Sequence, residues 1–273
     1  MPEHTFAATE PVLLYVENGA GNVDITATET QQAEVRVVGK HADDVVVHFE
    51  GGRLTVTAPK HRGFFSNDAK LDMDIVVPTR SSVMVKSGSA DVSVDGTVGE
   101  AEVKSGSGDV SLDRLAASAV VDTGSGDLRI AEALAELRVR SGSGDVTLDV
   151  LHGEASISTG SGDVRIEHSH APVVVKTGSG DLEVHRAETD LAMSTGSGDT
   201  VIHTAHRGRL SVKGASGDVQ VGIPEGVAVW TDITTVSGSV RSGIRGGGEP
   251  EDGQPYVEVR ATTVSGDVVL GRA

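Results

Sequence analysis

One short phrase returns seven times along this chain at a constant spacing. Its copies read SGSADVSV, SGSGDVSL, TGSGDLRI, SGSGDVTL, TGSGDVRI, TGSGDLEV and TGSGDTVI, and each begins 18 residues after the one before it, from Ser87 to Thr195. A fixed period of this size is typical of a solenoid, in which each repeat is one structural unit that buries its apolar face only against its neighbours. The repeat therefore constrains the fold strongly and the biochemical activity weakly.

Apolar and polar residues alternate inside each repeat. When a repeat is numbered from the residue after its aspartate, positions 1, 3, 10 and 12 are apolar in nearly every copy. A period of two predicts strands with one buried face, one from the aspartate to position 4 and one over positions 10 to 16. Equivalent strands of successive coils pair in parallel about 4.8 Å apart, and parallel crossovers are nearly always right-handed. The sequence thus predicts an all-β fold, a right-handed parallel β-solenoid (β-helix) with 18-residue coils.

The pattern predicts a single β-solenoid domain over residues 1–273. Residues 1–80 read as irregular N-terminal coils, because their strand-like runs are joined by variable connections. Residues 81–221 hold the regular repeats. Residues 222–273 read as C-terminal coils, with a projecting loop at 243–255 that is rich in glycine, proline and acidic residues.

A parallel solenoid must end in coils whose strand edges lack a partner on one side. The segments TFAATEPVLLYV near the N-terminus and VSGDVVLGRA at the C-terminus are the predicted end coils. Phe64 and Phe65 are expected to cover the N-terminal one, unless another subunit does so. Trp230, the only tryptophan, is expected to seal the C-terminal part of the core.

Turn chemistry accounts for every residue of the repeated phrase. Its glycines permit backbone angles closed to other residues, and aspartate in a tight turn accepts hydrogen bonds from nearby backbone N–H groups. By parity, the Ser or Thr before the first glycine and the Ser between the glycines point inward, where they must bond to each other or to the backbone. The repeat aspartates are therefore predicted to be structural. They are Asp91, Asp109, Asp127, Asp145, Asp163, Asp181, Asp199, Asp218 and Asp267.

Composition excludes several classes of partner. The formal charge of −17 would repel nucleic acids and acidic lipid surfaces. The absence of cysteine excludes disulfides and thiolate metal sites. No basic-then-apolar start and no run of about 18 apolar residues is present, so we expect no export signal, no membrane segment and a cytoplasmic location.

Two kinds of metal site were weighed against these features. The phrase resembles a calcium-binding nonapeptide, but one carboxylate per coil falls short of the six to eight oxygens that calcium takes. His185 and His203 share position 4 of adjacent coils, and His152 and His170 share position 7, with His168 nearby. His206 takes position 7 two coils further on. Stacked pairs could hold a metal, but a solvated turn explains them as well. We expect no catalytic residue, cofactor or metal, and we leave open whether the histidine cluster at 152–206 binds a metal.

The repeat, the opening NGAGNVDI, the phrase IVVP before the array and the ending TTVSGDVVLGRA together resemble the putative-adhesin, β-strand-repeat family of unknown function. The resemblance covers nearly the whole chain and implies a parallel β-helical fold without catalytic residues. It favours a non-enzymatic scaffold or adhesin-like interaction protein, with a protein partner or self-association. The alternative is a β-helical enzyme or ligand-binding protein acting on a sugar or acidic polymer, which fold analogy alone supports.

Overall fold

The computed structural model describes residues 2–59, 70–244 and 256–273. The chain divides into two compact units, Met1–Leu137 and Arg138–Ala273, and each is described by itself. Both are built almost wholly of strands, and within the described ranges no helix is long and apolar enough to cross a membrane. The prediction of a single domain with internal boundaries at 80 and 221 stays a prediction.

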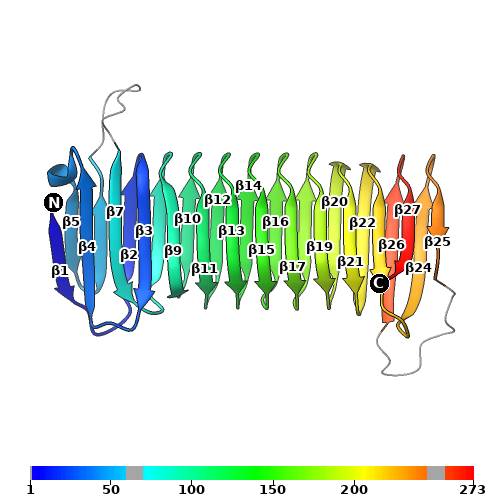
Figure 1. Ribbon diagram of the computed structural model, residues 1–273, viewed down its shortest axis with the longest axis horizontal. Coiled ribbons are helices and arrows are strands. Elements are labelled where there is room, and N and C mark those ends of the chain that lie inside the picture. The colour runs from blue at the N-terminus through cyan, green and yellow to red at the C-terminus, as the bar shows by residue number, and fades with distance from the viewer. Residues whose placement is uncertain (1, 60–69, 245–255) are drawn as a thin grey trace. The chain divides into compact units, whose positions relative to one another are not determined.

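Unit 1 contains thirteen complete strands and one short 3-10 helix in its described residues. They are β1 (Glu3–Ala7), β2 (Leu13–Asn18), β3 (Gly21–Thr28), β4 (Gln32–Gly39), η1 (Ala42–Asp44), β5 (Val46–Glu50), β6 (Arg53–Thr57), β7 (Leu71–Pro78), β8 (Ser82–Ser87), β9 (Asp91–Val98), β10 (Ala101–Ser105), β11 (Val110–Leu115), β12 (Ala119–Thr123) and β13 (Leu128–Ala133). One sheet, sheet A, has the order β1-β4-β7-β3-β9-β11-β13, and the facing sheet B has the order β5-β6-β2-β8-β10-β12 (Figure 1).

Unit 2 continues the same alternation between two sheets. Its strands are β14 (Leu137–Ser141), β15 (Val146–Leu151), β16 (Ala155–Thr159), β17 (Val164–Ser169), β18 (Val173–Thr177), β19 (Leu182–Ala187), β20 (Leu191–Ser197), β21 (Thr200–Ala205), β22 (Gly208–Ser216), β23 (Val219–Ile223), β24 (Ala228–Thr235), β25 (Val240–Ser242), β26 (Tyr256–Thr263) and β27 (Val268–Arg272). Sheet A runs β15-β17-β19-β21-β23-β27-β25 and sheet B runs β14-β16-β18-β20-β22-β26-β24.

The predicted parallel pairing of equivalent strands is observed within each unit. Ala101 pairs with Ala119 in unit 1, and Val173 pairs with Leu191 in unit 2, so paired residues are 18 apart in the sequence. Residues at positions 1, 3, 10 and 12 point between the sheets, and those in the array are almost completely buried apart from a few small ones. The core of each unit is therefore filled by aliphatic side chains.

One inward position escaped the sequence pattern. From Asp109 to Asp199, the strand that follows the repeat aspartate runs to position 6 instead of position 4, as in β11 and β15. Leu115 and Leu151 at position 6 are buried, whereas the two residues before each of them face outward or lie half-buried. Two successive outward residues break the alternation of period two, which is why the end of this strand read as a turn.

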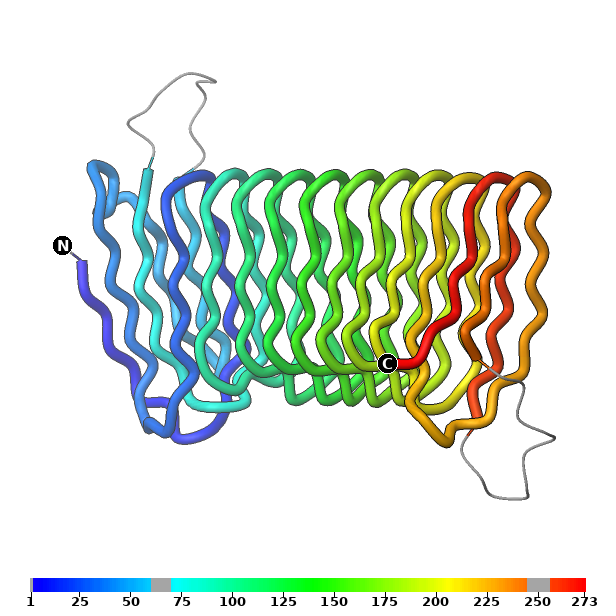
Figure 2. The backbone as a smooth tube through the Cα atoms, turned by 45° about the vertical axis from the view of Figure 1, so that its right-hand side comes forward, coloured from blue at the N-terminus to red at the C-terminus, as the bar shows by residue number. Residues whose placement is uncertain are grey.

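The order of coils at the C-terminal end of unit 2 departs from the order of the sequence. β26 and β27 lie between the coil of β22 and β23 and the coil of β24 and β25. In Figure 2 the red C-terminal segment lies between the yellow and the orange coils. The prediction that VSGDVVLGRA forms the end coil is therefore wrong. The end coil consists of residues 228–242, and we call it the C-terminal end coil.

The N-terminal end of unit 1 also differs from a plain solenoid. β2 and β3 form a parallel coil beside β8 and β9, with β6 and β7 on its other side. β1, β4 and β5 are antiparallel to their neighbours. They form the outer edge of unit 1, so the irregular N-terminal half is a set of coils plus an antiparallel cap.

The aromatic residues that were expected to cover the ends of the core can now be located in the fold. Trp230 does not seal the core, because it lies on the outer face of the edge strand β24 with half of its surface exposed and Arg260 stacked on it at 5.4 Å. Phe6 of β1 and Phe49 of β5 instead stack across the N-terminal end with ring centroids 5.2 Å apart. Phe64 and Phe65, and most of the loop at 243–255, lie outside the described residues.

Candidate functional site

The repeat aspartates form a hydrogen-bonded ladder along one edge of each unit. In unit 2 the carboxylate of Asp145 accepts the backbone N–H of Asp163 at 2.8 Å, and that of Asp163 accepts the N–H of Asp181 at 2.8 Å. Asp91, Asp109 and Asp127 are linked in the same way in unit 1. The predicted turn hydrogen bond therefore runs between coils, from each aspartate to the backbone of its successor. The structural role of these aspartates remains a prediction.

The ladder in unit 2 follows the spatial order of the coils. Asp218 accepts the N–H of Asp267, and Asp267 accepts the N–H of Ser239 at 2.8 Å. Ser239 belongs to the C-terminal end coil, and no further strand of the described residues lies beyond it. In this copy of the phrase, Ser239 stands in place of the aspartate. Beyond its coil the described residues offer no backbone N–H group that a carboxylate could bind.

Close stacking, and not an unusual backbone angle, explains the glycines of the regular turns. A Cβ atom on Gly108 would overlap the carbonyl oxygen of Ala90, and one on Gly162 would overlap that of Gly144. Neither glycine has a φ in the left-handed region. The expectation that the glycines supply special backbone angles is therefore wrong for these turns, where the missing side chain lets successive turns pack, although it holds for Gly217, whose φ is +136°.

The hydroxyl groups of the phrase divide between inside and outside. Most of those before the first glycine are buried, and they bond within the turn, as where Ser105 donates to the carbonyl of Gly108 at 2.8 Å. The serine between the glycines, such as Ser107, is exposed, which contradicts its predicted inward orientation. The buried residue at that corner is the following glycine, Gly108, so the alternation shifts by one residue before Ser107 and not after it.

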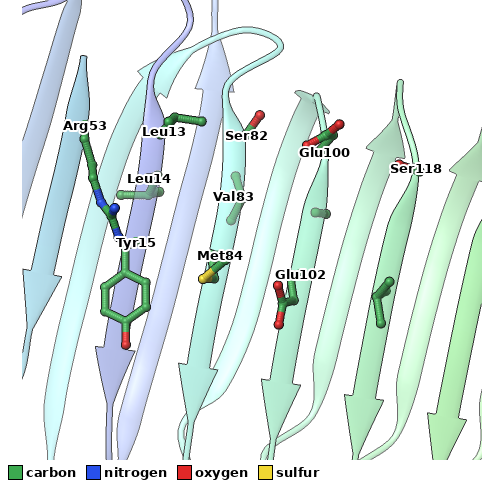
Figure 3. Close-up of a pocket in the computed structure, with 12 residues that line it drawn as sticks. Leu13, Leu14, Tyr15, Arg53, Ser82, Val83, Met84, Glu100, Glu102 and Ser118 are labelled. Carbon is green, nitrogen blue, oxygen red and sulfur yellow. The ribbon is translucent and has the colours of Figure 1, made fainter. Parts of the chain in front are cut away.

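A shallow groove of about 370 Å³ crosses the outer face of sheet B in unit 1 (Figure 3). Leu13, Tyr15 and Met84 supply much of its apolar floor, with Glu100 and Glu102 beside them. Arg53 lies over the ring of Tyr15 at 5.9 Å, and the Tyr15 hydroxyl donates to Glu17 at 3.0 Å. These interactions hold the ring flat on the sheet. The groove is open and lacks a converging set of acid and base groups, so it suits contact with an apolar surface better than chemistry.

Exposed apolar side chains gather at the C-terminal end of unit 2. Of nine large exposed hydrophobic residues among those described, five lie between residues 230 and 264. They are Trp230, Val236, Val240, Tyr256 and Val264. Val236 is 77% exposed, the highest value among the nine. Clusters of this kind on a soluble protein mark contact surfaces more often than isolated exposed residues do.

A network of ion pairs around the buried carboxylate of Glu258 links β26 to the neighbouring strand β22. Glu258 of β26 is the only charged residue that is buried in the described part of the chain. Arg209 donates to one of its oxygens at 2.7 Å and Arg260 to the other at 2.6 Å. These two guanidinium groups hold the pKa of Glu258 below its ordinary value of 4.5. A carboxylate held between two cations is a structural tie and is not free to act as an acid or base.

The histidine columns stack as their equal positions predicted. The rings of His185 and His203 lie 4.6 Å apart, and those of His152 and His170 lie 5.0 Å apart. Glu183, which the sequence did not single out, lies beside the first pair and receives a hydrogen bond from His203 at 2.9 Å. That bond, together with Arg165, holds the pKa of Glu183 below its ordinary value. Glu183 is at position 2, on the same outward face as position 4, and this shared parity is the signal that could have identified it.

The sequence matches the Toastrack DUF4097 family twice, over residues 14–171 and over residues 121–270. The two matches overlap and together span most of the 273 residues. No curated protein matches the sequence.

Three solved structures are similar to this chain at low identity. A "putative adhesin" from Parabacteroides merdae is 12% identical, with 80% of this chain and 94% of that chain covered and a TM-score of 0.42. A "putative adhesin" from Bacteroides fragilis is 14% identical, with 98% and 96% covered and a TM-score of 0.41. A "putative lipid binding protein" from Parabacteroides distasonis is 15% identical, with 98% and 96% covered and a TM-score of 0.39. At these TM-scores none of the three carries an argument about this chain.

Proposed function

The chain belongs to the Toastrack DUF4097 family, and from its geometry we propose that it is a non-enzymatic, adhesin-like scaffold that joins a second copy of itself through the C-terminal end coil. The observation that carries this proposal is that five of the nine large exposed hydrophobic residues described lie in the last two coils of a strongly acidic protein. Proteins of this kind rarely leave such a cluster uncovered unless it is a contact surface.

The charge of this end favours contact between copies. Residues 228–242 and 256–273 contain three carboxylates, Asp232, Glu258 and Asp267, and three arginines, Arg241, Arg260 and Arg272, so their formal charge is zero. The whole chain carries −17. Two copies that meet here therefore avoid the repulsion that opposes contact along the rest of the acidic surface.

The backbone of the end coil is also open on one side. β24 is the last strand of sheet B and β25 the last strand of sheet A in unit 2, so each has a strand partner on one side only. Exposed strand edges pair readily with strands of other chains. A twofold axis would place β24 against its own copy in antiparallel orientation, which makes the contact self-complementary and closed.

Oligomeric mass measured by light scattering tests this proposal. We expect the wild-type chain to show twice the mass of one chain in a concentration-dependent manner, and Trp230→Ser with Val236→Ser to show the mass of one chain. The control is Val174→Ser, because Val174 is an exposed hydrophobic residue on β18, away from the end coil. A wild-type chain that stays monomeric at high concentration, or a control that dissociates as fully as the end-coil variant, overturns the proposal.

Four finer features belong to the same proposal. The parallel pairing of residues 18 apart supports coils of 18 residues, and the strong preference of parallel crossovers supports a right-handed coil. A role without catalysis is the third of these features. A cytoplasmic location is proposed on the sequence alone. An experimental structure tests the length and the handedness of the coil. An assay for hydrolysis of sugar or acidic polymers tests the lack of catalytic activity.

A further inference from the structure

We propose that Glu183, His185 and His203 form a binding site for one borderline transition-metal ion, such as Zn²⁺, on the outer face of sheet A in unit 2. Their ligand atoms all lie within 4.8 Å of one another, and within the described residues no other group of three such side chains does so. The three come from the adjacent strands β19 and β21, which pair in parallel. A rigid sheet therefore sets their spacing, and no loop has to move to assemble them.

The distances fit the coordination sphere of zinc. Tetrahedral zinc with bonds of about 2.0–2.1 Å to nitrogen and oxygen places its ligand atoms about 3.3 Å apart. Oε1 of Glu183 lies 2.9 Å from Nε2 of His203 and 3.5 Å from Nε2 of His185. These two separations bracket the required value. An ion that replaces the proton shared by this group would need only small side-chain rotations.

The surroundings leave room for the ion and for a fourth ligand. The side chains of His185, His203 and Glu183 are 42%, 46% and 31% exposed, so the ion can enter directly from solvent. Oε1 of Glu167 lies 3.9 Å from Nε2 of His185 and offers a further oxygen. Arg165 binds the other oxygen of Glu183 at 2.6 Å, which orients the carboxylate as an outer-shell partner does. The positive charge of Arg165 opposes the binding of a cation, so we expect the metal to bind reversibly.

The donor set decides the class of metal. Two imidazoles and one carboxylate suit zinc, copper and nickel, whereas calcium and magnesium prefer oxygen ligands throughout. The calcium-like appearance of the repeated phrase is unrelated to this site, because the three ligands lie on the strands that follow the turns. The site is also separate from the C-terminal end coil, so it does not depend on the proposed self-association.

The second histidine pair provides a matched control. His152 and His170 stack at 5.0 Å on the same unit, and the Nδ1 of His170 lies 3.1 Å from Glu188. This pair resembles the first in ring spacing and exposure to solvent, but it is not part of any group of three ligands within 4.8 Å among the described residues. A contribution of stacked histidines in general can thus be separated from a contribution of this particular triad.

Isothermal titration of the full chain with ZnCl₂ tests the proposal. We expect one zinc site that His185→Ala with His203→Ala abolishes, that Glu183→Gln weakens at least about tenfold, and that His152→Ala with His170→Ala leaves unchanged. CaCl₂ should give no binding at this site. All the changed side chains are on the surface, and unaltered circular dichroism and thermal unfolding confirm that each variant is folded.

Several outcomes would overturn the assignment. Wild-type protein that binds no zinc sets it aside directly. If the His185→Ala, His203→Ala variant binds zinc with unchanged affinity, any zinc site lies elsewhere. If the His152→Ala, His170→Ala variant loses zinc affinity equally, the binding is not specific to the triad. Calcium that competes with zinc for the triad refutes the class of metal.

Discussion

The N-terminal end of unit 1 and the C-terminal end of unit 2 end their sheets in different ways. At the first, antiparallel strands β1 and β5 flank the core and Phe6 stacks on Phe49 across it. At the second, β24 and β25 are parallel to their neighbours and Trp230 faces outward. Both ends finish in edge strands, but two aromatic rings stack across the first end, whereas the tryptophan of the second end faces outward.

Charge separates the two ends as well. Residues 3–7 and 32–50 contain five carboxylates and two cations, a formal charge of −3, whereas the C-terminal end coil and its neighbouring coil are neutral. Acidic edge strands discourage pairing with other chains. The comparison teaches that a solenoid can suppress association at one end by a cap and by charge while retaining an end that is suited to contact.

The largest expected effect comes from removing the aromatic cap. Phe6→Ala with Phe49→Ala should lower the free energy of unfolding by about 3 kcal/mol, the lower end of the range for buried phenylalanine, because both rings are only half-buried. Urea unfolding measures this loss. A loss no larger than that of Trp230→Ala would show that the two ends are closed equally and would break the comparison.

The aspartate ladder should respond next. Asp145→Ala removes the acceptor of the Asp163 N–H and should cost about 0.5–2 kcal/mol, as the loss of a side-chain cap does. Asp267→Ala should cost less, because it releases only the terminal coil, where Asp267 holds Ser239 and Arg241. Asp145→Asn keeps an acceptor oxygen and serves as the control. Equal losses at both positions would indicate that the C-terminal end coil is bound as tightly as the array.

Acid should loosen the C-terminal end before the N-terminal cap. The pKa of Glu258 is lowered by Arg209 and Arg260, and that of Asp267 is lowered by the backbone and side chain of Ser239. A lowered pKa contributes stability above the ordinary values of 4.5 and 3.8, and this contribution is lost as the pH falls through the folded-state pKa values. Hydrogen exchange should therefore show amides of β24 and β25 exposed at a higher pH than amides of β4. The reverse order would contradict the assignment of Glu258 as the tie of this end.

The smallest effect is expected from the exposed tryptophan itself. Trp230→Ala should change the free energy of unfolding of the dilute, monomeric chain by less than about 0.5 kcal/mol, as surface substitutions usually do. Its stacking with Arg260 is the only contact of the ring that is described. Thermal unfolding at low protein concentration measures this change. A large loss would mean that Trp230 supports the fold and would return it to the sealing role that the sequence predicted.

The sequence predicted the sheets well because one physical rule governs them. Alternation of period two identified the inward residues of the array, such as Val110 and Leu112, and the constant spacing identified their partners. The rule failed where the chain turns a corner. Ser107 and Leu115 lie next to such corners, and the backbone there shifts the parity by one residue.

Features that depend on spatial order were beyond the sequence pattern. Spacing in the chain could not show that Asp267 lies nearer the array than Ser239, because a long connection can return to either side of a coil. The missing carboxylate at Ser239 was the available clue. Glu183 did not stand out in the sequence, because comparing coils at equal positions pairs only residues with the same position number. Its contact with His203 joins position 2 of one coil to position 4 of the next.

The inserted coil at the C-terminal end has a consequence for synthesis of the chain. Residues 228–242 leave the ribosome before residues 256–273, yet the later segment supplies the layer that connects the earlier one to β22 and β23. Domains begin to fold as they emerge, N-terminal part first. The end coil therefore has no complete neighbour to pack against until residues 256–273 have left the ribosome. A stop codon placed before residue 256 would remove an internal layer of the stack, and the strands left outside it would lose their place in both sheets.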